Sequence, residues 1–181
     1  TGDIAESQAT FENSKAAQFS KKKWKAIDGF RSVKFGMNEK QVLRAIAKDF
    51  KILKNTVKRE THPKEKTTAL FFRLPRLLEV GGPADIVYII GYKSKRLIQV
   101  NIDWGIEVSK GVPSQEVIDA ANLLGKFFNE KRYQKKGYLF NQRINDTTVI
   151  VFRGKDKKGR MILLRLKNSK DKAGEHEKQA R

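Results

Sequence analysis

The alternation of apolar and polar side chains over residues 97–104 constrains the fold more than any other feature. Every second residue from Ile98 to Trp104 is apolar, whereas Gln99, Asn101 and Asp103 between them are polar. Because successive side chains of a strand point to opposite faces, this segment predicts a strand with one buried face and one face in water. We therefore expect a sheet with one wet face.

Other short runs have the composition of strands and are separated by turn residues. They span residues 67–74, 85–92, 138–144, 147–153 and 160–166. Turn residues separate several of them, with a basic turn at 93–96, Asn-Asp at 145–146 and a turn that begins and ends with glycine at 154–159. Runs of this length that end in turn residues predict an antiparallel sheet built largely from hairpins.

Two segments have the apolar spacing of helices. In residues 38–50, Asn38 is a good N-cap and Gln41 stands at capping-box distance from it. The second helix begins at Ser114, and its apolar residues from Val117 to Phe128 recur at helical intervals. Each segment therefore predicts a helix with one buried face.

The order helix, strand, strand, strand occurs twice along the chain. We therefore expect an α+β fold in which a helix is followed by a three-stranded antiparallel sheet, present twice in tandem. Residue-level similarity between the halves is confined to the hairpins at 86–98 and 149–162, which leaves an internal duplication open. The expected parts are a basic-ended arm (1–26), two helix-plus-sheet units (27–108 and 109–167) and a polar tail (168–181).

The chain is strongly basic, with 39 lysines and arginines against 20 acidic residues and a formal net charge of +19. Such an excess repels itself and attracts polyanions. Nucleic acid, anionic lipid headgroups, acidic cell-wall polymers and acidic proteins are all candidate partners. The alternative is that lysine only keeps the surface soluble.

Basic residues gather at the arm and at predicted turns, where a long side chain reaches outward without disturbing a strand. Trp24 and Tyr133 are interleaved with lysines, so each could stack on a base or lie among lipid headgroups, or could complete the core. The candidate binding residues are Lys22, Lys23, Trp24, Lys93, Lys95, Arg96, Arg132, Lys136, Lys157, Lys158 and Arg160.

Residues typical of catalysis or metal binding are scarce. The chain has no cysteine, and neither His62 nor His176 has a second histidine nearby to complete a metal site. The glycines at 81 and 82 lack the strand-to-helix context of a phosphate loop. We therefore expect a protein that is not an enzyme, with no catalytic residue, metal or cofactor. No apolar run is long enough for a transmembrane segment.

Residues 29–42 carry a resemblance to a known family. They read GFRSVKFGMNEKQV, similar to the opening Phe/Leu-x-x-Gly-Met-Thr-x-x-Gln-Val of the SmpA/OmlA (BamE-like) envelope proteins. In that family the phrase leads from an extended segment into a helix and a three-stranded sheet, and a tandem of this layout occurs in β-lactamase-inhibitor-like proteins. The chain departs from the family in having no lipidated cysteine, a long arm and a more basic composition.

A second resemblance joins residues 29–37 and 91–100, which look like uncharacterised exported proteins of proteobacteria. That likeness brings no activity with it. Together the two resemblances imply an envelope-located binding or scaffold module without catalytic residues. The start at Thr1 rather than Met suits either a processed, exported chain or an artificially shortened one.

The expected function is thus a non-enzymatic binding or scaffold protein of the bacterial cell envelope, periplasmic or otherwise exported. Its basic loop tips would engage an anionic macromolecule, with an acidic protein or a membrane surface favoured as partner. The alternative is a cytoplasmic nucleic-acid-binding protein. The excess of lysine over arginine and the lack of a known nucleic-acid motif count against that alternative. An enzyme with an unfamiliar site is the third possibility.

Overall fold

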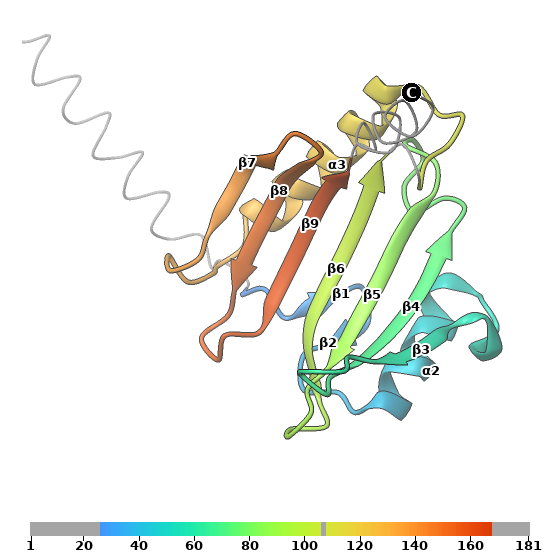
Figure 1. Cartoon of the computed structure of the whole chain (residues 1–181), viewed down its shortest axis with the longest axis vertical. Coiled ribbons are helices and arrows are strands. Elements are labelled where there is room, and N and C mark those ends of the chain that lie inside the picture. Colours follow the sequence, from blue (N-terminus) through green and yellow to red (C-terminus); the bar gives the residue numbers. More distant parts are fainter. Residues whose placement is uncertain (1–25, 106–107, 168–181) are drawn as a thin grey trace, which may run out of the picture.

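A computed structural model describes residues 26–105 and 108–167. Its centre is one seven-stranded mixed sheet in the order β3-β4-β5-β6-β9-β8-β7, accompanied by a two-stranded ribbon (Figure 1). The expected polar tail and most of the expected arm lie outside the described residues.

The predicted helices and strands are confirmed, with shifts of one or two residues at their ends. The helices are α2 (Glu39–Phe50) and α3 (Ser114–Asn129), and a short 3₁₀ turn, η1, spans Lys54–Thr56. The strands are β1 (Gly29–Phe30), β2 (Val33–Lys34), β3 (Lys58–Thr61), β4 (Thr68–Leu74), β5 (Ala84–Ile90), β6 (Leu97–Gly105), β7 (Leu139–Asn145), β8 (Thr148–Lys155) and β9 (Met161–Lys167).

The expected fold class is wrong. The described chain is mostly β, with one seven-stranded mixed sheet and two α-helices, rather than a helix and a three-stranded antiparallel sheet repeated in tandem. One cause is β3, which adds a fourth strand after α2. All four of its residues are exposed, so it has none of the apolar alternation by which strands are recognised.

A parallel pairing of β6 with β9 is the other cause. It aligns Val100 with Ile162, and Ile102 with Leu164. Since both strands place these residues on the same face, pairing them merges the two sets of strands into one sheet over one core. Two separate sheets would leave the edges of β6 and β9 unpaired.

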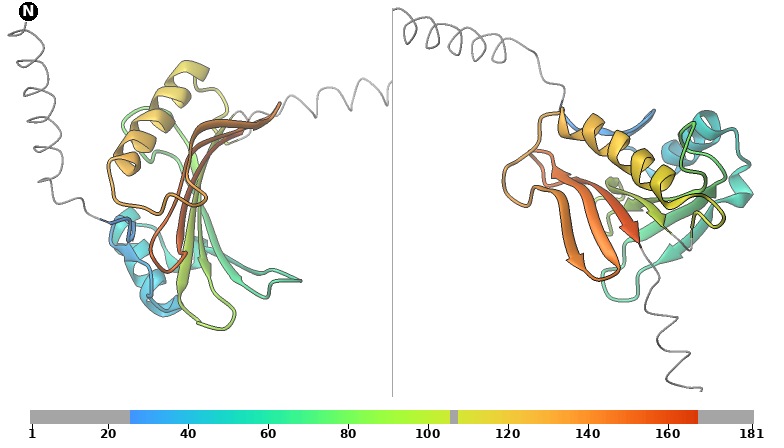
Figure 2. Two further views of the ribbon diagram at one scale, coloured as in Figure 1. Left: turned by 90° about the vertical axis from the view of Figure 1, so that its left-hand side faces the viewer. Right: turned by 90° about the horizontal axis from the view of Figure 1, so that it is seen from above.

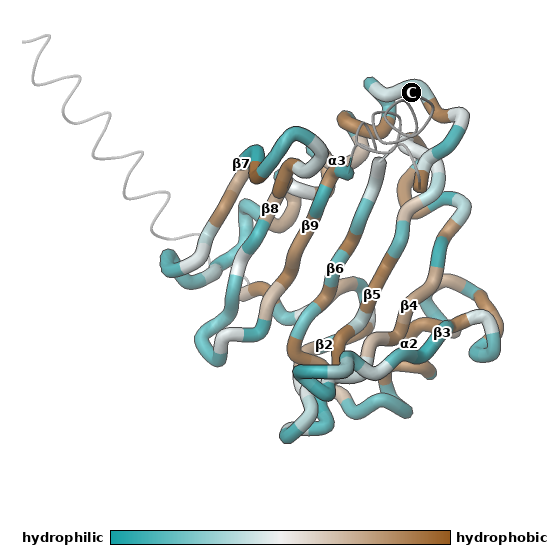
Figure 3. Tube along the Cα trace, viewed as in Figure 1, coloured by the Kyte–Doolittle hydropathy of each residue, from teal (hydrophilic) through white to brown (hydrophobic). Residues whose placement is uncertain are grey.

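Both helices and the ribbon lie on the same side of the sheet, as Figure 2 shows in its left view. Val42 and Ile46 of α2, and Leu124 and Phe128 of α3, are buried against the sheet together with Trp104. Neither of the described helices covers the opposite face, which confirms for residues 26–105 and 108–167 the expected one-sided covering. In Figure 3 apolar residues follow the central strands while the turns are hydrophilic.

The start of α2 forms as its sequence predicts. Asn38 Oδ1 accepts from the backbone N–H of Gln41 at 2.9 Å, and Gln41 Oε1 accepts from the N–H of Asn38 at 2.9 Å. This capping box satisfies two N–H groups that the helix itself cannot pair. It fixes α2 at the place where the chain leaves the ribbon.

Candidate anion-binding surface

The topology brings the basic turns to one end of the sheet. The β3–β4, β5–β6 and β8–β9 turns and the loop before β7 all lie there, because neighbouring strands other than β6 and β9 are antiparallel. The parallel pair contributes decisively, since both of its strands start at this end (Figure 1). We call this surface, made of residues 62–66, 92–96, 132–137 and 156–160, the basic end.

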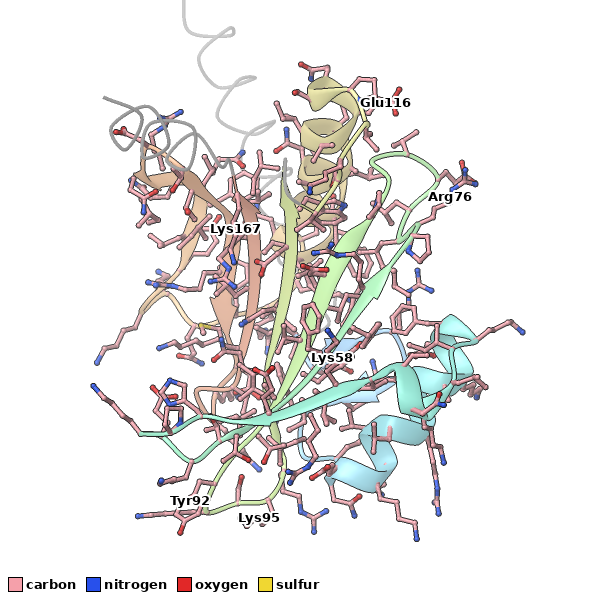
Figure 4. The ribbon with its side chains drawn as sticks, turned by 45° about the vertical axis from the view of Figure 1, so that its right-hand side comes forward. Lys58, Arg76, Tyr92, Lys95, Glu116 and Lys167 are labelled. Carbon is pink, nitrogen blue, oxygen red and sulfur yellow. The ribbon has the colours of Figure 1, made fainter. Side chains whose placement is uncertain are left out.

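Cations far outnumber acids at the basic end. The opposite end, by contrast, has Arg76 and Lys110 balanced by Glu79 and Asp146 in the loops at 75–83, 108–113 and 146–147. Figure 4 shows Tyr92 and Lys95 far from Arg76 and Glu116. The acids of the basic end are Glu65 and Asp156, and its cations are Lys64, Lys66, Lys93, Lys95, Arg96, Arg132, Lys135, Lys136, Lys157, Lys158 and Arg160.

The β5–β6 turn presents an exposed aromatic ring among lysines. Tyr92 is 52% exposed, and Lys95 Nζ lies 4.7 Å from the centre of its ring. The turn is closed by the N–H of Gly91, which donates to the carbonyl of Arg96 at 2.9 Å. None of the cations in this turn forms an ion pair with a described carboxylate. Their charge is therefore available to a partner.

The β8–β9 turn is organised around Asp156, which is 9% exposed. Its Oδ1 accepts from the N–H groups of Lys158 and Arg160, each at 2.9 Å, and its Oδ2 accepts from Arg160 Nε at 2.6 Å. The guanidinium of Arg160 also lies 5.2 Å from the centre of the Phe35 ring. Arg160 is thus a paired, structural cation, whereas Lys157 and Lys158 are exposed.

Residues 35–36 join the two turns. Arg96 Nη1 donates to the carbonyl of Gly36 at 3.4 Å, and Arg160 stacks on the preceding ring of Phe35. The N–H of Gly36 donates to the carbonyl of Leu97 at 3.1 Å. Residues 35–36 therefore support the basic end directly.

Most of the predicted binding residues come together, but not all in the same role. Lys93, Lys95, Lys157 and Lys158 are exposed at adjacent turns, and Lys136 is exposed in the loop before β7. The side chain of Arg132 is exposed in the same loop, and its carbonyl accepts from the N–H of Ile27 at 3.1 Å. Arg96 and Arg160 contact the fold as described above. The predicted residues Lys22, Lys23 and Trp24 lie outside the described residues.

Tyr133 completes the core rather than offering its face to a ligand. Its ring stacks on Tyr138 with centres 4.6 Å apart and meets Phe152 edge-on. Its hydroxyl donates to Asn129 Oδ1 at 3.1 Å. Burial, followed by the hydrogen bond with Tyr138, raises the pKa of Tyr133 to about 12. Of the two readings of this residue, the structural one fits its position.

A basic stripe on α2 was missed from the sequence. Lys40, Arg44 and Lys48 are exposed and follow one another at intervals of four residues, so they line one face of the helix. Like charges at this spacing destabilise a helix by about 0.2–0.5 kcal/mol per pair. The four-residue spacing of these cations is present in the sequence of the predicted helix and is the signal that identifies the stripe. An isolated bridge between Asn38 and Arg96 places the start of α2 at the basic end.

Two buried carboxylates, which the sequence did not predict as a pair, lie side by side on the face of the sheet opposite the two described helices. Asp85 and Asp103 are register partners, at 9% and 5% exposure. Arg73 binds Asp85 through two nitrogens at 2.6 and 2.8 Å, and Arg165 binds Asp103 at 2.7 and 2.8 Å. Because each carboxylate already has a two-pronged arginine partner, this row ties strands together.

A cavity of about 260 Å³ lies at the other end of the sheet, between α3 and the ends of β6, β8 and β9. Val117, Val149 and Leu166 form part of its walls, and Arg143 and Lys167 are among its polar residues. None of the predicted binding residues lines it. The anion-binding candidates and the cavity are therefore separate features of the molecule.

Within residues 26–105 and 108–167, no three histidine, aspartate or glutamate side chains are grouped closely enough to hold a metal ion. No helix in the same ranges is both long and apolar enough to cross a membrane. Comparison with known protein families, with characterised proteins and with solved structures finds no match. The resemblance to the BamE-like family therefore stays a prediction.

Proposed function

We propose that this chain is a binding protein that holds an anionic macromolecule against the basic end of its sheet. One observation carries the proposal, namely that cations from four segments far apart in the sequence meet at one end. Seven strands at about 4.8 Å spacing make this end roughly 30 Å wide. A surface of that width and charge favours an extended polyanion over a small ligand.

The distribution of charge distinguishes a binding role of the cations from a role in solubility alone. Cations that only keep a protein soluble can lie anywhere on its surface, and spreading them lowers their mutual repulsion. Here the loops at one end hold eleven cations and two acids, whereas the loops at the other end are balanced. Concentrating lysines costs repulsion that a bound polyanion would relieve, which supports a binding role.

We also propose that the protein acts in the bacterial cell envelope, exported from the cytoplasm. Support comes from the phrase at residues 29–42, whose segment 35–36 holds the two basic turns together. Fractionation of cells that express the untagged gene tests this location. Recovery of the protein with the periplasm and envelope is expected, and recovery in the cytosol without a processed form would contradict it.

The binding proposal is tested by reversing charge at the basic end. Lys93, Lys95, Lys157 and Lys158, changed together to Glu, remove four exposed cations that have no described ion-pair partner. With heparin as a linear polyanion probe, affinity should fall at least about tenfold and depend less steeply on salt. The melting temperature should change little, since these side chains are exposed.

A control variant carries the same net charge. It replaces Arg76, Lys110, Lys126 and Arg143 by Glu, four exposed cations that are not among the residues of the basic end. We expect it to lose much less affinity for heparin. Equal losses in the two variants would mean that total charge alone attracts the polyanion, and the proposed site would be wrong. A collapse of stability in the first variant would instead make those lysines structural.

A further inference from the structure

We infer that the anionic partner is the surface of a lipid bilayer rich in anionic headgroups, held by the basic end and the α2 stripe with Leu53 and Tyr92 as apolar anchors. This inference rests on the proposed function, because it names the polyanion that the cations attract. The observation behind it is that each of these exposed apolar side chains has exposed lysines next to it, Lys51 and Lys54 beside Leu53 and Lys93 and Lys95 beside Tyr92.

Leu53 is the more exposed of the two anchors. It follows α2 and is 70% exposed, the largest value among the large apolar residues that the structure describes. Exposed lysines flank it at positions 51 and 54. Its carbonyl accepts from the N–H of Thr56 at 3.0 Å and from Thr56 Oγ1 at 2.7 Å, so its backbone is fixed while its side chain projects. An apolar side chain held outward in this way is placed to bury itself in an apolar layer outside the chain.

Tyr92 provides the second anchor, at the tip of the β5–β6 turn. Figure 4 shows it beside Lys95 at the far end of the molecule from Glu116. Tyrosine is enriched where hydrocarbon meets headgroups, because its ring is apolar and its hydroxyl is polar. The neighbouring lysines can reach lipid phosphates while the ring enters the boundary layer.

The α2 stripe adds cations beside these anchors. The buried face of α2 packs Val42 and Ile46 into the core, so its opposite face is left to carry Lys40, Arg44 and Lys48 outward. Lysine and arginine have long apolar stems, which lets the stem lie on an apolar layer while the charge reaches phosphate. Leu53 follows the end of this helix, and the bridge from Asn38 to Arg96 ties the beginning of the helix to the turn that carries Tyr92.

The same residues fit the other polyanions less well. Nucleic-acid bases are read mainly by arginine, asparagine and glutamine, whereas the unpaired cations of the two hairpin turns are mostly lysines. A phosphate backbone gives an exposed leucine nothing to bury against. A polybasic surface that includes apolar residues is instead the pattern of proteins that bind at the headgroup layer.

The test measures co-sedimentation of the full chain with two kinds of vesicle. One contains equal parts phosphatidylglycerol and phosphatidylcholine, and the other contains phosphatidylcholine alone. We expect binding to the anionic vesicles only, weakening as salt increases. Replacing Lys40 and Lys48 by Gln should weaken that binding roughly tenfold, whereas Lys110→Gln with Lys126→Gln should change it little.

The anchors are tested with a matched apolar pair. Leu53→Ser with Tyr92→Ser should lower partitioning onto anionic vesicles at least about fivefold. Val80→Ser with Ile144→Ser, which changes residues that are 46% and 52% exposed elsewhere, should leave it unchanged. Equal losses in the two double variants would overturn the anchoring role.

A labelled cysteine reports insertion directly. Because the chain has no cysteine, Leu53→Cys and Ile144→Cys each give one site for an environment-sensitive fluorophore. With anionic vesicles the emission of the label at position 53 should shift to the blue, and that of the label at 144 should not. No shift at either position would show that Leu53 stays in water, contrary to the inference.

Failure of this inference differs from failure of the proposed function. If the chain binds heparin at the basic end but ignores anionic vesicles, the bilayer is wrong and the anion-binding role stands. If duplex DNA binds more tightly than the vesicles, with no effect of the Leu53 and Tyr92 substitutions, nucleic acid is the partner instead. If heparin, vesicles and DNA all fail to bind, both proposals are wrong.

Discussion

Two buried polar atoms of the described core have no hydrogen-bond partner there, the Tyr88 hydroxyl and the Trp104 indole nitrogen. Both side chains are fully buried over the sheet. Burial raises the pKa of Tyr88 well above its ordinary value, so the hydroxyl keeps its proton. An unpaired buried polar group costs about 1–3 kcal/mol, and these two atoms therefore mark places where the core is less stable than it could be.

Tyr88→Phe should raise the free energy of unfolding by about 1 kcal/mol, because it removes an unpaired hydroxyl and keeps the ring. Urea denaturation at neutral pH measures the change. Tyr138→Phe is the contrasting variant, since it loses the hydrogen bond to Asn129 and should lower the free energy by about 1 kcal/mol. A comparable loss in Tyr88→Phe would mean that its hydroxyl has a partner after all.

The raised pKa of Tyr133 predicts a pH dependence of stability. Between its ordinary value of 10.0 and about 12, the unfolded chain loses this proton while the folded chain keeps it. The contribution of Tyr133 is thus complete below pH 10 and is lost as the pH rises towards 12. Unfolding curves across this range should show a shallower fall for Tyr133→Phe than for the unchanged chain. Identical slopes would show that the pKa of Tyr133 is not raised.

Among the elements, the pairing of β6 with β9 holds the two sets of strands together, and it depends on Gly105 at its end. Gly105 has a φ of 150°, and a Cβ there would collide with the carbonyl oxygen of Lys167. Only glycine therefore allows the two strands to stay paired up to Lys167. This close approach also sets how far the parallel pair extends.

Gly105→Ala should lower the free energy of unfolding by about 3 kcal/mol, because it adds a clash to a strained backbone. Gly111→Ala provides the control. Gly111 also has a positive φ, of 78°, but a Cβ there meets open space, so the cost should be only about 1 kcal/mol. Thermal unfolding of both variants distinguishes the two. Equal losses would show that strain alone, without contact between β6 and β9, accounts for the effect.

The local elements could be predicted from the sequence, whereas the joining of the sheet could not. The cap at Asn38 and the alternation of β6 depend only on residues that are close together in the sequence. Even there a register shift near Ile90 pairs that residue with Leu97, which is buried, while Ile98 is partly exposed. β3 has no buried residue to identify it, and the partner of β6 lies about sixty residues further along the chain.

At the scale of the whole molecule, the order and direction of the strands gather much of the excess positive charge at one end of the sheet. The basic residues at 93–96, 132–136 and 157–160 were visible in the sequence, whereas the β3–β4 turn was not, and the meeting of these segments at one end depends on β6 and β9 being parallel. Had the pair been antiparallel, the β5–β6 and β8–β9 turns would lie at opposite ends of the sheet. The paired state of Arg160 was equally out of reach, because it depends on Asp156 and Phe35.

The most direct measurement of the central claim is a two-dimensional NMR titration of the ¹⁵N-labelled chain with a short heparin fragment. The account predicts that amide shifts change at residues 92–96, 135–137 and 156–160, while those at 76–80 and 143–147 stay in place. Changes confined to that opposite end, or spread evenly over the surface, would contradict it.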